Sequence, residues 1–134
     1  MHIYRFRVLC DGVDEFVREI EVGSHQTFLV CLYSIYECTT LERKGDVSFY
    51  ISNIRWLEIK EIGLNERSAP KNFFDDEEEL RADERRRKLP FTLMANALMR
   101  DFIEDPHQRI ILEHPGGETR IFYIELLKIA KSSE

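Results

Sequence analysis

Apolar and polar residues alternate along residues 3–10, the pattern of a half-buried strand. Arg5 and Arg7 fall on one face together with Ile3 and Leu9. The apolar face of this stretch is predicted to carry Tyr4, Phe6, Val8 and Cys10. Residues 11–14 contain Asp-Gly, a signal for a short turn, and residues 15–22 alternate again. A β-hairpin is therefore predicted over 3–22.

The period then changes to that of a helix. Over residues 28–39 the apolar positions recur three and four apart, at Phe28, Cys31, Leu32, Ile35 and Tyr36. Ser24 or Thr27 is a suitable N-cap for this helix, which is expected to lie across the sheet. A short strand follows at 47–52, whereas residues 58–64 fit neither period and are either a strand or irregular.

The middle of the chain is dominated by charge. Residues 75–88 place acids first and bases last, which suits a helix dipole, and acids precede bases at spacings of four. This predicts a solvated helix or a partly disordered segment within a charged insert at about 65–90. After Pro90, Thr92 is a plausible cap for a second helix over 92–104, with Met94, Ala97, Leu98 and Phe102 inward.

The last apolar run completes the pattern. Residues 109–113, the turn signal at 114–118 and residues 120–129 predict a second hairpin. Residues 121–124 are consecutively apolar, which indicates an interior strand that is covered on both faces. This strand is expected at the centre of the sheet, with the helices at 28–39 and 92–104 as its two covers.

Composition narrows the class of protein. The 134 residues predict one domain, 1–134, and 43% hydrophobic with 33% charged residues is a globular profile. The net charge of −6 argues against non-specific nucleic-acid binding, which needs a dominant basic face. Cys10, Cys31 and Cys38 lie in apolar contexts without Cys-x-x-Cys spacing, which favours reduced core thiols. A cytoplasmic location without a membrane segment is predicted.

Motifs that carry chemistry are scarce. The glycines fall at turns, and the four histidines have no metal-ligand spacing, so no catalytic, cofactor or metal site is predicted. The candidate polar site consists of Arg18, Glu113, Glu125 and Arg120. Arg18 either packs its stem at the sheet margin or binds an anion, and Glu125 is either outward or paired with an arginine. Trp56 is either a packing residue at the rim or an exposed anchor.

Several short motifs carry a family resemblance. They are Tyr4–Val8, Phe16–Arg18, Thr27–Leu29, Ser48–Asn53 with Trp56, Ile62–Leu64 and Thr119–Leu126. With these the chain resembles the plasmid pRiA4b ORF-3-like family, often labelled insertion-element passenger TnpR family proteins. The resemblance implies a compact α+β, β-grasp-like domain with a mixed sheet and no assigned activity. Where the family has aromatic–x–aromatic–Asp, this chain has Ile110–Glu113 followed by Pro115, so a site built on those residues is not carried over.

Three functions follow as hypotheses. The first is a non-catalytic protein-interaction module that uses a sheet edge or the charged insert, with an unknown protein partner. The second is an enzyme with a dispersed polar site near the last hairpin. The third is weak nucleic-acid binding through the basic run Arg81–Lys88, which the neighbouring acids oppose. The oligomeric state stays open between a monomer and a homodimer.

Overall fold

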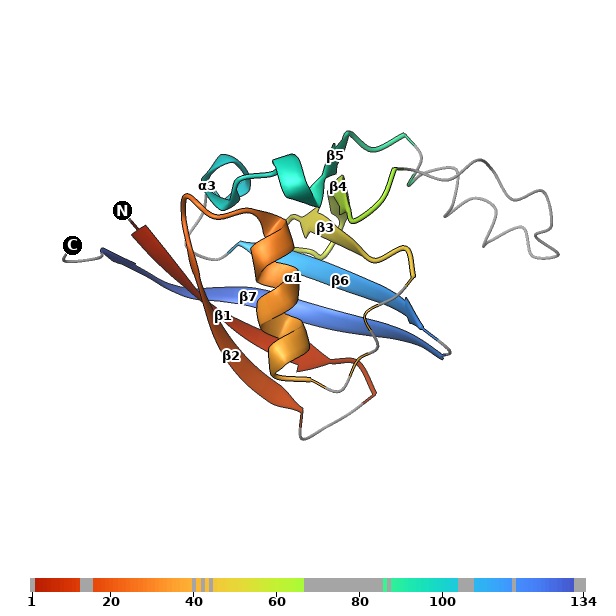
Figure 1. Cartoon of the computed structure of the whole chain (residues 1–134), viewed down its shortest axis with the longest axis horizontal. Coiled ribbons are helices and arrows are strands. Elements are labelled where there is room, and N and C mark those ends of the chain that lie inside the picture. The colour runs from red at the N-terminus through yellow and green to blue at the C-terminus, as the bar shows by residue number, and fades with distance from the viewer. Residues whose placement is uncertain are drawn as a thin grey trace, which may run out of the picture.

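One seven-stranded sheet is the framework of the molecule (Figure 1). The computed structural model describes residues 2–12, 16–39, 41, 43, 45–66, 86, 88–103, 108–116 and 118–131. The strands are β1 (His2–Cys10), β2 (Val17–Gly23), β3 (Ser48–Ser52), β4 (Glu58–Gly63), β5 (Phe91–Leu93), β6 (Arg109–Gly116) and β7 (Glu118–Lys131). Their order is β2-β1-β7-β6-β3-β4-β5. All neighbours are antiparallel except β4 and β5, which run parallel.

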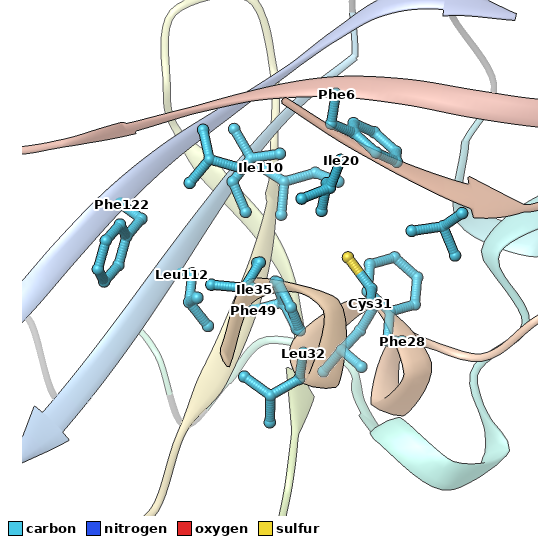
Figure 2. Packing of buried hydrophobic residues seen from close by; sticks show 14 of the residues in the cluster. Phe6, Ile20, Phe28, Cys31, Leu32, Ile35, Phe49, Ile110, Leu112 and Phe122 are labelled. Atoms are coloured by element: carbon cyan, nitrogen blue, oxygen red, sulfur yellow. The ribbon is translucent and has the colours of Figure 1, made fainter. Parts of the chain in front are cut away.

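Helix α1 (Phe28–Glu37) covers one face of this sheet, as the apolar spacing predicted (Figure 1). Thr27 is its N-cap and accepts a hydrogen bond from the Val30 amide at 3.5 Å. In Figure 2, Phe28, Cys31, Leu32 and Ile35 of the helix point toward side chains of the sheet. Tyr4, Phe6, Val8 and Cys10 are buried there as well, so the predicted inward face of β1 is confirmed, and Ile20 and Val22 of β2 are buried beside them.

The predicted helix over 92–104 is wrong. Residues 91–93 form β5, Met94–Asn96 are a 3-10 turn (η1), and only Met99–Phe102 are α-helical (α3). Thr92, expected as a cap, pairs with β4 instead. Backbone hydrogen bonds to the chain before α1, such as Met99 N–H to the Gln26 carbonyl at 2.8 Å, accompany an extended backbone at Ala97 and Leu98 between the two short turns. Tertiary pairing therefore overrides the helical spacing.

This segment also lies on a different face from the one expected. Met94, Ala97 and Met99 belong to the same buried cluster as α1, and the rings of Phe28 and Phe102 are 5.6 Å apart. The described helices α1, η1 and α3 thus share one side of the sheet. We call the opposite side the outer face; the expectation that 92–104 covers it is corrected.

Strand β7 is an interior strand, between β1 and β6, which confirms that part of the prediction. Its consecutive apolar residues divide between the two faces. Phe122 and Ile124 are buried against α1, whereas Ile121 and Tyr123 are partly exposed on the outer face. The run is therefore apolar on a face that the described helices leave open.

These observations define a single mixed α+β domain, as predicted, and its described residues are mostly in strands. The β-grasp-like arrangement is not confirmed, since the sheet has seven strands and β1 runs antiparallel to β7. Residues 58–64, left open above, contain strand β4. The predicted helix or disordered segment at 75–88 falls almost wholly outside the described residues. Among the described helices, none is long and apolar enough to cross a membrane.

Candidate functional site

The four residues of the predicted polar site do not gather in one place. Arg18 on β2 and Arg120 on β7 alternate in register with buried residues and so lie on the α1 side. Glu113 and Glu125 lie on the outer face. Even these two are separated, because Glu125 pairs with Arg109, four residues from Glu113 along β6 and hence roughly 13 Å away.

Arg18 has a local structural role. Its guanidinium lies 4.6 Å from the centre of the Phe16 ring and donates to the carbonyl oxygen of Cys38 at 3.3 Å. Cys38 is the C-cap of α1, where backbone carbonyls carry partial negative charge. Arg18 thereby connects the edge strand to the end of the helix.

Glu113 is part of a charged cluster that sequence reasoning missed. Arg86 Nη1 lies 2.7 Å from Glu113 Oε2, and Arg86 Nε lies 3.2 Å from Glu58 Oε2. The same guanidinium is 4.5 Å from the centre of the Tyr50 ring. Burial alone would lower the pKa of Arg86, but Tyr50 and the two carboxylates together raise it, so it stays a cation. Nothing in the basic run Arg81–Lys88 distinguishes Arg86 from its neighbours, so the sequence holds no signal for this role.

A second cluster surrounds Trp56 in the turn between β3 and β4. The Asn53 side-chain oxygen accepts hydrogen bonds from the amides of Arg55 (2.9 Å) and Leu57 (3.0 Å), and the Trp56 amide donates to the Asn53 carbonyl (3.0 Å). This network holds Trp56 at φ 62°, a left-handed conformation that is rare for a bulky residue.

The Trp56 indole is held from two sides on the outer face. Its ring is 5.0 Å from that of Tyr123 in an edge-on arrangement, and the Arg109 guanidinium is 4.9 Å from its centre. Arg109 also donates to the Ile54 carbonyl. The turn presents two apolar side chains to solvent, Ile54 at 72% and Leu57 at 51% exposure. We call Ile54, Trp56, Leu57, Arg109 and Tyr123 the Trp56 patch. Of the two alternatives for Trp56, the structure supports the packing residue, and exposed apolar side chains lie next to it.

The described residues supply little for catalysis. They hold no cluster of three or more histidine, cysteine or acidic side chains that would bind a metal ion. Cys10 and Cys31 are buried free thiols and Cys38 is partly buried. Burial raises the pKa of Cys31 to about 12, so it is protonated at neutral pH and a poor nucleophile.

The fold defines a class: a single α+β domain whose seven-stranded mixed sheet carries its described helices on one face. The crystal structure of the protein of unknown function MM3350 from Methanosarcina mazei Go1 has this fold, with a TM-score of 0.72 and 17% sequence identity over 99% of this chain. This chain spans 64% of the length of that protein. At this identity the likeness concerns the fold. No protein-family model and no curated protein matches the chain.

Proposed function

We propose that this protein is a non-catalytic protein-interaction module that binds its partner through the Trp56 patch. The observation that carries the proposal is the packing of Trp56 between Tyr123 and Arg109 beside exposed apolar residues. Trp, Tyr and Arg are the residues enriched in binding hot spots, because each combines a large contact area with a polar group. The partner is a protein of unknown identity.

Backbone geometry supports a rigid binding surface. A non-glycine residue in the left-handed region costs on the order of 1–3 kcal/mol and persists only where its surroundings enforce it. Here the enforcement comes from the Asn53 hydrogen bonds and from the two side chains that hold the indole. A surface ordered before binding loses less entropy when the partner docks.

We also propose that the chain belongs to the plasmid pRiA4b ORF-3-like family, on the short motifs given above. The motif Ser48–Asn53 with Trp56 leads directly into the Trp56 patch, and Thr119–Leu126 includes Tyr123. The β-grasp-like sheet that this resemblance implies stays a prediction. The mobile-element label of such proteins does not imply recombination chemistry.

The two alternative functions gain no support from the described residues. An enzyme near the last hairpin would need Arg18, Glu113 and Glu125 together, and they lie on two faces. For nucleic-acid binding, Arg86 of the basic run is engaged by two carboxylates. A gel shift with mixed DNA at low salt that shows retention would revive that alternative, since electrostatic binding is strongest there.

Site-specific photo-crosslinking tests the proposed function. The crosslinker p-benzoylphenylalanine is placed at Ile54 and, as a matched control, at the exposed Tyr33 on α1 (48% exposed). In cells that naturally contain the protein, we expect a discrete adduct from position 54 and none of that size from position 33. Adding Trp56→Gly, which keeps the left-handed turn but removes the indole, should abolish the adduct. Equal adducts from both positions, or none from position 54, would contradict the proposal.

A further inference from the structure

A hollow of about 300 Å³ lies beside α1, and it is independent of the Trp56 patch on the outer face. Its wall consists of Leu32, Tyr33 and Tyr36 from the helix, Leu64 after β4, and Arg43 from the connection between α1 and β3. Such a volume is at the lower end of the range of small-ligand sites. Four of the five described side chains that line it are aliphatic or aromatic, so the body of a ligand would be apolar.

Among the described residues of this wall, Arg43 is the one that carries a charge. Its side chain is exposed, and its guanidinium lies 5.6 Å from the centre of the Tyr36 ring. Among the described residues, Arg43 has no carboxylate within ion-pair distance, in contrast to Arg5 and Arg86. A guanidinium beside an apolar wall favours an anion, and its planar fork matches a carboxylate.

Tyr36 contributes its aromatic ring to this wall. The residue is 6% exposed, its ring packs edge-on at 6.0 Å from that of His114, and its hydroxyl has no hydrogen-bond partner in the described part of the chain. Burial raises the pKa of this hydroxyl, so it keeps its proton and can donate. A buried hydroxyl without a partner is unfavourable, and phenylalanine would fill the same space without that penalty. The oxygen is also closed to solvent, so a ligand in the hollow contacts the Tyr36 ring and not its hydroxyl.

We propose that the hollow binds a small organic acid, with an aromatic or branched aliphatic body against Leu32, Tyr33 and Leu64. The carboxylate of this ligand pairs with the Arg43 guanidinium. Inorganic anions are poor ligands for this hollow, because they have no apolar part to cover the side chains of Leu32, Tyr33 and Leu64. A neutral amide of the same shape would lose the charge-assisted contact.

The test uses phenylacetate, with phenylacetamide as its neutral isostere. Both are titrated to about 20 mM against the ¹⁵N-labelled full chain, with amide shifts as readout. We expect phenylacetate to move the amides of Tyr33, Tyr36 and Leu64 with a Kd on the order of 1 mM, as befits a ligand of this size. Phenylacetamide should bind at least about tenfold more weakly.

Variants test the charged group. Arg43→Gln should weaken phenylacetate at least about tenfold, whereas Tyr36→Phe and Arg55→Gln in the β3–β4 turn should leave its affinity unchanged. The spectra also show that each variant is folded. The proposal is overturned if phenylacetate shifts no amide, shifts amides elsewhere, or binds no better than phenylacetamide. It is equally overturned if Arg43→Gln and Arg55→Gln behave alike.

Discussion

The hydroxyl of Tyr36 allows a stability prediction that runs against the usual effect of core mutations. Tyr36→Phe removes one oxygen that has no partner among the described residues and leaves the contacts of the ring with His114 and Arg43 in place. An unsatisfied buried polar group costs about 1–3 kcal/mol. Part of that cost is relieved by local movement, so we expect Tyr36→Phe to stabilise the fold by about 1 kcal/mol, or about 3 °C in Tm.

Urea unfolding followed by far-UV circular dichroism at pH 7 measures this difference. Tyr33→Phe is the matched control: it lies in the same helix, is 48% exposed, and should change the free energy of unfolding by less than about 0.5 kcal/mol. A Tyr36→Phe variant that is destabilised by more than about 0.5 kcal/mol would refute the reasoning, because its hydroxyl would then have a partner.

The pH dependence of the same variant provides an independent check. Burial raises the pKa of Tyr36 in the folded state, so the folded chain holds this proton more tightly than the unfolded chain does. The wild-type protein therefore loses stability as the pH rises above about 10, the ordinary tyrosine pKa. Tyr36→Phe lacks this loss, and its advantage over the wild type should widen above that pH. A constant difference would contradict the burial of the hydroxyl.

Three further predictions concern the rest of the domain. Arg86→Gln should lower the free energy of unfolding by about 2–3 kcal/mol in urea titrations, because two half-buried carboxylates lose their cation; a loss no larger than that of Lys88→Gln would contradict it. Gly63→Ala places a Cβ 2.7 Å from the Phe91 ring and should cost about 1–3 kcal/mol by thermal melting; an unchanged Tm would show that β5 moves freely. Burial raises the Cys31 pKa to about 12, so the wild type should lose part of its stability advantage over Cys31→Ala between about pH 8.5 and 11. Urea unfolding at several pH values measures this advantage, and a constant value would count against burial of the thiol.

The sequence predicted those parts of the fold whose periodicity agrees with their tertiary contacts. The first hairpin, α1 with its Thr27 cap and the last hairpin are all present. A helix was wrongly predicted over 92–104 because Met94, Ala97 and Leu98 are spaced as in a helix. Pairing of its backbone with β4 and with the chain before α1 decides its structure, and such long-range bonds leave no local signal.

The candidate polar site fared differently, for a related reason. Its residues were chosen as charged side chains within or beside apolar strands. In the structure, alternation along the strands puts Arg18 on the α1 side and Glu113 on the outer face. The partner of Glu113 is Arg86, 27 positions earlier in the chain and within an unremarkable basic run. Trp56 was expected either to pack at the rim or to be an exposed anchor, and its ring packs against Tyr123 and Arg109. Its left-handed backbone depends on Asn53, and a single asparagine three positions earlier is too weak a signal to predict that conformation.

The pairing of β1 with β7 sets the order in which the sheet can be assembled. During synthesis the β1–β2 hairpin and α1 emerge first, yet one edge of β1 has no neighbour until residues 122–131 are made. Until then the apolar side chains of β1 can be covered by α1, but its free backbone groups are open to other chains. Closure of so long a loop is slow. The hairpin is therefore open to misassembly in the newly made chain, and its pairing with β7 ends this exposure.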